Sequence, residues 1–158
     1  MEAQEVGYVL PVDAWAALAA LQGAASFWAL EGQEAPDAAK GWAWLLDAEL
    51  AQETPEHMLV EPVLLALAAQ MAKAQDLISF QRGRRAASLF RGPDFALVWE
   101  SLPGGMVRAT PFPTQQAAVG SLEERIFASS DAPVHACCRG GQGVIWERHM
   151  SREELRAL

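Results

Sequence analysis

Metal-ligating and nucleophilic side chains gather at one point of this 158-residue chain, in the segment His135-Ala136-Cys137-Cys138. On a strand, alternate side chains share a face, so His135 and Cys137 would point one way and Cys138 the other. Zinc needs about four ligands. His149 is a possible addition, but no fourth ligand and no C-x₂-C spacing is present. We therefore predict no metal site and interpret both cysteines as small core residues.

A thiol nucleophile would need a base within hydrogen-bonding reach and a group that orients that base. None of His57, His135 and His149 stands in a recognisable local signature. The glycine-rich stretches lie between expected strands, whereas a phosphate-binding loop leads from a strand into a helix. We predict no catalytic residue and no cofactor, and we rank an enzyme that uses the Cys/His segment as the third alternative.

Basic side chains cluster at Arg82, Arg84 and Arg85. We assign these three arginines to partner binding. The alternative is a solvated turn whose charges protect edge strands from aggregation.

Three tryptophans, Trp28, Trp42 and Trp44, lie close together in the sequence. Trp42 and Trp44 are two positions apart, so on a helix they do not face the same core. Exposed tryptophan is enriched at protein interfaces. We therefore assign all three to partner binding, with the alternative that a loop or a hairpin covers the second one.

The elements that must position these residues are organised around a predicted four-strand meander from Leu77 to Phe112. Turn residues separate its short apolar segments, and short turns between short strands indicate antiparallel pairing. Phe95, Leu97 and Trp99 alternate with smaller or polar residues, which predicts one bulky face packed on a helix over residues 61–75.

The other predicted elements are recognised from apolar periodicity and from capping residues. They are a short strand over 6–12, a helix from an Asp13 N-cap to Gly23, an ambiguous segment over 25–30, a helix from Pro36 and Asp37 to Leu50, a break at Thr54-Pro55, a helix from Thr114 to Ala128, a hairpin of Val134–Arg139 and Val144–Arg148, and a closing helix with the capping box Ser151 to Glu154. Segregated helices and antiparallel strands predict the α+β class, in a single domain over residues 1–158.

Charge is unevenly distributed along the chain, whose net charge is −8. Residues 1–76 hold twelve acids against two lysines, and residues 77–158 hold eight acids and ten arginines. An acidic half is a poor surface for phosphate backbones, so we predict no nucleic-acid partner.

The acidic start lacks the positive region of a signal peptide, and the longest uncharged run, Ala14 to Leu30, is 17 residues. A spanning helix needs about 20 apolar residues, so we predict no membrane partner and a cytoplasmic location.

A family resemblance rests on Gly41-Trp42 to Leu50, on Glu61-Pro62-Val63-Leu64-Leu65-Ala66-Leu67 and on Phe95 to Trp99. Over roughly residues 10–128 this order of patterns resembles the EspG-like proteins associated with ESX (type VII) secretion. The resemblance implies a mixed α/β scaffold and a cytosolic chaperone. The chain is shorter than the double-unit form usual in that family.

The function predicted from these patterns is a non-enzymatic chaperone or adaptor that binds a secreted or toxic protein client in a bacterial-type cytoplasm. The alternative is an immunity-type protein whose acidic N-terminal half neutralises a basic toxin. The sequence predicts no particular oligomeric state.

Overall fold

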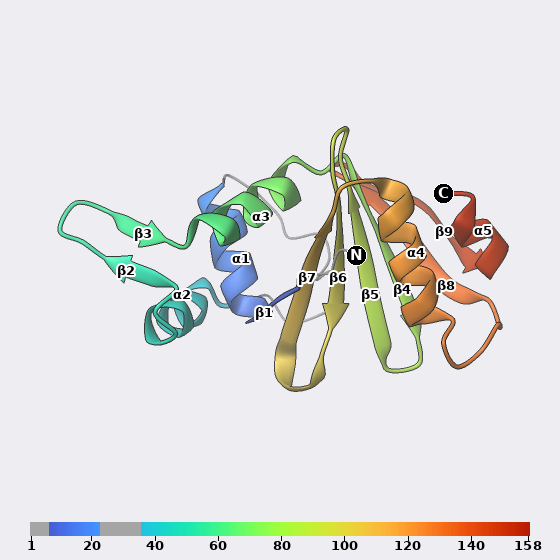
Figure 1. The fold of residues 1–158 in the computed structure, drawn as a ribbon, viewed down its shortest axis with the longest axis horizontal. Coiled ribbons are helices and arrows are strands. Elements are labelled where there is room, and N and C mark those ends of the chain that lie inside the picture. The colour runs from blue at the N-terminus through green and yellow to red at the C-terminus, as the bar shows by residue number, and fades with distance from the viewer. Residues whose placement is uncertain (1–6, 23–35) are drawn as a thin grey trace, which may run out of the picture.

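A computed structural model describes residues 7–22 and 36–158, which form a large antiparallel sheet with helices on both faces (Figure 1). The α+β class is confirmed. The sheet has the strand order β1-β7-β6-β5-β4-β8-β9. Its strands are β1 (Tyr8–Pro11), β4 (Asp76–Arg82), β5 (Arg85–Arg91), β6 (Ala96–Ser101), β7 (Met106–Phe112), β8 (Val134–Gly140) and β9 (Gly143–Met150). The ambiguous segment over 25–30, the predicted helix end at Gly23 and Trp28 lie outside the described residues.

The predicted meander is confirmed as β4 to β7, with every neighbouring pair antiparallel. Its turns use backbone conformations that favour glycine. Gly83 has a φ of 58° between β4 and β5, and Gly104 has a φ of 76° before β7. The predicted C-terminal hairpin is β8 and β9, and it extends the same sheet because β8 pairs with β4.

Both faces of the sheet are buried. One face packs on α1 (Val12–Leu21), α2 (Ala38–Asp47) and α3 (Pro62–Lys73). Leu97 and Trp99 belong to this core as predicted, and Phe95 packs against it from the turn before β6. The other face packs on α4 (Gln115–Ile126) and α5 (Arg152–Arg156), through residues such as Val98 and Leu122. Side chains that alternate along the strands therefore contribute to two cores, one on each face of the sheet.

The first helix begins earlier than predicted. Pro11 is its N-cap and Asp13 lies in its first turn, so the assignment of Asp13 as the cap was wrong. The Asp13 carboxylate instead accepts a hydrogen bond from the backbone N–H of Asp37 at 2.8 Å, which ties α1 to the start of α2. Trp15 ties α1 to the sheet, because its indole N–H donates to the carbonyl of Val107 at 3.1 Å.

The second helix ends earlier than predicted and leads into a hairpin that the sequence patterns did not indicate. Asp37 caps α2 by accepting from the N–H groups of Ala39 and Lys40, but the helix stops at Asp47 instead of Leu50. The antiparallel strands β2 (Ala51–Glu53) and β3 (Met58–Val60) follow. The predicted break at Thr54 is their turn.

The remaining predicted helices are confirmed, and the ends of α3 and α4 lie one or two residues inside the predicted ones. Thr114 caps α4 by accepting from the N–H of Ala117, and Ser151 with Glu154 forms the predicted capping box of α5. Among the helices of residues 7–22 and 36–158, none is long and apolar enough to cross a membrane.

Candidate functional site

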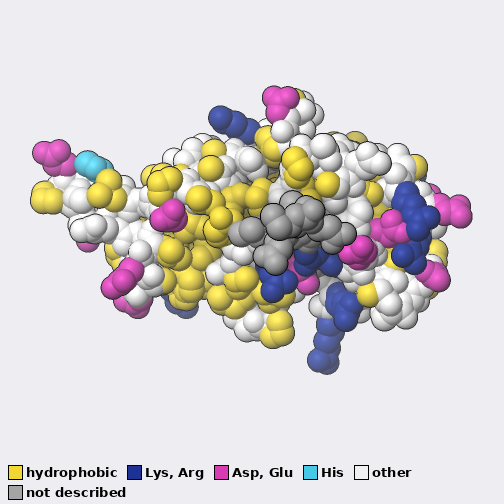
Figure 2. Space-filling view, in the orientation of Figure 1, with side chains coloured by type: hydrophobic (Ala, Val, Ile, Leu, Met, Phe, Trp, Pro, Cys, Tyr) yellow, Lys and Arg dark blue, Asp and Glu magenta, His cyan; other side chains and the backbone are white. Residues whose placement is uncertain are grey.

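The three predicted arginines Arg82, Arg84 and Arg85 come together in one pocket of about 710 Å³. The pocket lies where the β4–β5 and β6–β7 hairpins meet the end of α4, at the lower end of the sheet in Figure 1. Lys and Arg side chains gather in the same region in Figure 2. Its lining combines charged and small apolar side chains: Phe80, Arg82, Arg84, Arg85, Ala86, Ala87, Glu100, Ser101, Leu102, Pro103, Arg125, Ile126 and Ala128.

Cross-strand register explains part of the hollow. Phe80, Ala87 and Glu100 lie directly opposite one another on β4, β5 and β6, so they form one row on the α4 side of the sheet. The middle residue of this row is an alanine, which leaves space between a phenylalanine and a glutamate. The last turn of α4 ends at Ile126 and forms part of the pocket wall.

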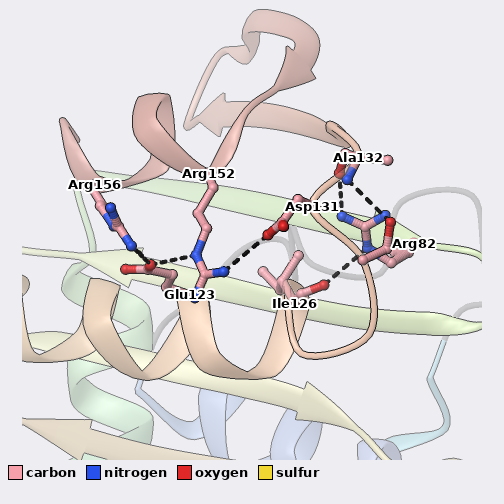
Figure 3. A network of polar contacts seen from close by, with 8 residues as sticks. Arg82, Glu123, Ile126, Asp131, Ala132, Arg152 and Arg156 are labelled. Carbon is pink, nitrogen blue, oxygen red and sulfur yellow. Dashed lines mark hydrogen bonds and ion pairs between the residues drawn. The ribbon is translucent and has the colours of Figure 1, made fainter.

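Two of the arginines stabilise the end of α4. The guanidinium of Arg82 donates through Nε to the carbonyl of Ile126 at 3.0 Å and through Nη2 to the carbonyl of Ala132 (Figure 3). Arg85 donates to the carbonyl of Arg125 at 3.4 Å. The last carbonyls of a helix have no partner within the helix and carry partial negative charge, so these contacts cap α4 from a different part of the chain.

The alternative interpretation of this cluster is right about the turn, where Arg84 and Arg85 are exposed, but wrong about edge strands. β4 lies between β5 and β8, and β5 lies between β4 and β6, so both strands are interior. Arg82 and Arg85 contact the end of a helix instead of protecting a bare strand edge.

Arg84 differs from its neighbours because it sits at the tip of the β4–β5 turn with an exposed side chain. The one carboxylate of the lining, Glu100, accepts from Arg125 and lies 3.5 Å from Arg108. Four arginines against one glutamate make the lining strongly positive. Carbonyl caps do not neutralise a guanidinium, so the pocket keeps this charge in a chain of net charge −8.

The tryptophans Trp42 and Trp44 lie on a different surface, formed by α2 on the opposite side of the sheet from α4. Both are half-buried and pack against the core of α1 and α3. The prediction that the two do not face the same core was wrong, because both pack against this one core, although each keeps an exposed part. Gly41 allows this packing, because a Cβ there would lie 2.1 Å from the backbone oxygen of Asp13. The third assigned tryptophan, Trp28, lies outside the described residues.

The β2–β3 hairpin adjoins α2 and projects from the body of the molecule (Figure 1). Leu59 on this hairpin is 48% exposed, and Val63 at the start of α3 is 39% exposed. Hydrophobic side chains form a broad patch over the α1–α3 region in Figure 2, with acidic side chains at its margin. Residues 36–61 contain six acids and the single base Lys40. We call α2, β2 and β3 with Val63 the helical surface.

The Cys/His segment lies on β8 with the predicted alternation. Cys138 is in the core on the α4 side, where burial raises the pKa of its thiol to about 11. A thiol with so high a pKa is protonated at neutral pH and is a poor nucleophile. His135 lies directly opposite His149, with ring centroids 5.8 Å apart, and its Nε2 is 2.7 Å from a carboxylate oxygen of Glu147. Over residues 7–22 and 36–158, no three His, Cys, Asp or Glu side chains group as metal ligands.

A second charged cluster joins α4 to α5 and is structural (Figure 3). Glu123 accepts from Nε of Arg156 at 2.7 Å and from Nε of Arg152 at 2.6 Å, and Arg152 also reaches Asp131 at 3.0 Å. Hydrogen bonds from Arg156 and then Arg152 lower the pKa of Glu123 to about 2. The glutamate is satisfied within the protein, so it holds the closing helix in place.

No protein-family model and no curated protein matches this chain. The EspG-like resemblance therefore stays a prediction from sequence patterns.

Proposed function

We propose that this protein is a non-enzymatic chaperone or adaptor, acting in a bacterial-type cytoplasm, that binds a secreted or toxic protein client through the helical surface. The observation that supports the proposal is the pair Trp42 and Trp44, both partly exposed on one helix beside a projecting hairpin with an exposed leucine. Partly exposed tryptophans on a rigid helix are typical anchors of protein interfaces.

The charge around this surface indicates the chemistry of the client. Residues 36–61, which form most of this surface, hold five more acids than bases. A client segment with apolar residues flanked by lysine or arginine would match both features, since complementary charge steers association and apolar contact slows dissociation.

Copurification with unbiased mass spectrometry identifies the client, and surface plasmon resonance then measures its kinetics. We expect Trp42→Ala and Trp44→Ala to raise the dissociation rate about 30-fold or more, the effect of losing an interface hot spot of about 2 kcal/mol. Trp146→Ala is the matched control, because Trp146 is also half-buried but lies on β9 against the other core. Unchanged kinetics in both α2 variants would exclude the helical surface.

The alternative is an immunity-type protein that neutralises a basic toxin through its acidic N-terminal half. The observation that favours it is the same concentration of acids. Exposed charges are screened beyond about 8 Å at physiological ionic strength, so electrostatic capture of a toxin would give association rates that fall steeply with added salt. A chaperone that holds its client mainly through Trp42 or Trp44 would keep most of its affinity at high salt, because salt does not screen the apolar contact that slows dissociation.

A further inference from the structure

The arginine pocket has a chemical character that client binding at the helical surface does not use. Its lining carries four arginines and one glutamate, yet most of its other residues are apolar, among them Ala87, Leu102 and Ile126. It lies on the α4 side of the sheet, whereas Trp42 and Trp44 pack on the α1–α3 side. Its volume of about 710 Å³ is in the range of small-molecule sites, which run from about 300 to 1,000 Å³.

Three of the four arginines are held by other groups of the protein, and the fourth, Arg84, lies at the rim of the pocket. Arg82 and Arg85 are held by carbonyls of α4 and of the loop that follows it, and Arg125 is held by Glu100 and by Ser121 at 3.0 Å. Arg84 is exposed at the turn, and its guanidinium makes no hydrogen bond or ion pair within the described part of the chain. A guanidinium is permanently charged and presents paired N–H donors that suit carboxylate and phosphate oxygens.

We propose that this pocket binds an organic anion with a carboxylate or phosphate head on an apolar body. The head lies at the rim, at Arg84, and the body lies against Ala87, Leu102 and Ile126. Both halves of the ligand are required by the lining. An anion without an apolar body leaves the apolar side chains of the pocket exposed to water. A neutral apolar molecule leaves the rim guanidinium without a charged partner.

A long polyanion such as a nucleic acid is a poor ligand for the arginine pocket. The chain as a whole carries a net charge of −8, which disfavours a long polyanion that would extend beyond the arginine cluster. A compact anion meets the local field of the pocket and little of the rest, because exposed charges are screened beyond about 8 Å.

Isothermal titration calorimetry on the full chain tests the proposal with four probes. Octanoate and octyl phosphate have both halves of the ligand, octanol lacks the charge, and acetate lacks the body. We expect octanoate or octyl phosphate to bind at least about tenfold more tightly than octanol and acetate. The stronger of the two anions identifies the head group. Equal affinity for octanoate, octanol and acetate would overturn the proposal.

The variant Arg84→Ala tests the site, because Arg84 is exposed and its loss leaves the caps of α4 in place. We expect it to weaken octanoate binding about tenfold or more, the effect of losing a charge-assisted hydrogen bond. Arg148→Ala removes another exposed arginine, on β9 and outside the pocket, and should leave binding unchanged. Equal affinity of the wild type and Arg84→Ala would refute the assignment.

Amide chemical shifts locate the bound anion independently of affinity. With octanoate, shifts should concentrate around residues 82–86, 100–103 and 125–128 and spare the β2–β3 hairpin. Perturbation centred on the hairpin would place the ligand on the helical surface and overturn the proposal.

Sedimentation with phosphatidylglycerol vesicles separates a free anion from a lipid surface. Binding to vesicles with none to the soluble probes would also overturn it. Arg84→Ala leaves the helical surface intact, so the kinetics of client binding should not change in this variant. Failure of anion binding and failure of client binding can therefore be told apart.

Discussion

Replacement of Trp99 by alanine is the most direct test of how the sheet and the first three helices are held together. Trp99 is 5% exposed on β6, in the core shared with α1 and α3, and its ring meets that of Phe90 edge-on at a centroid distance of 5.8 Å. A tryptophan buries about 150–250 Å², which at about 25 cal/mol per Å² corresponds to about 4–6 kcal/mol. Alanine keeps part of that area, so we expect the free energy of unfolding to fall by about 3–5 kcal/mol.

Urea denaturation followed by circular dichroism measures this loss, provided that the slope of the transition stays unchanged. Trp146→Ala is the matched control, because Trp146 is only half-buried on the edge strand β9. We expect it to lower the free energy of unfolding by less than about 2 kcal/mol. A loss below about 1 kcal/mol for Trp99→Ala would place Trp99 outside the core and refute the packing of β6 on the first three helices.

Three further predictions follow from close contacts. Gly41→Val should lower the free energy of unfolding by about 1–3 kcal/mol or more, because a Cβ at that site lies 2.1 Å from the backbone oxygen of Asp13; a melt identical to the wild type would contradict the close approach of α1 and α2. The pKa of Glu123 is lowered from 4.5 to about 2, so its contribution to stability is complete above about pH 4.5 and is lost as the pH falls towards 2. Urea melts of Glu123→Gln should therefore differ from the wild type at neutral pH and converge with it near pH 2, and a constant difference would refute this linkage. Cys138 should resist iodoacetamide at pH 8 until the protein is denatured, because burial raises its pKa to about 11, and rapid labelling of the native protein at Cys138 would contradict that environment.

Several elements could be predicted from the sequence because their signals are local. The helix α3 has a continuous apolar face, with Leu64, Leu67 and Met71 buried as their spacing indicates. The capping box at Ser151 and the cap at Thr114 each depend on residues three positions apart. The meander was predictable because short turns force neighbouring segments to pair.

The β2–β3 hairpin could not be predicted in this way. Its first strand, Ala51–Glu53, is short and mostly polar, and neither strand has a β-branched run. It forms after α2 stops at Asp47, through a turn in which Thr54 Oγ1 donates to the carbonyl of His57 at 2.6 Å. That turn has no Asn-Gly or Asp-Gly signal.

The candidate sites show the same division between local and distant causes. The sequence by itself determined which residue types were present: an arginine cluster at Arg82 to Arg85, two tryptophans two positions apart, and an acidic first half. Only the tertiary structure decided that Arg82 and Arg85 cap a helix some forty residues away, and that Ala87 lies between Phe80 and Glu100 in a hollow. Those contacts join segments far apart in the chain, and no periodicity within one segment records which distant segment will pack against it.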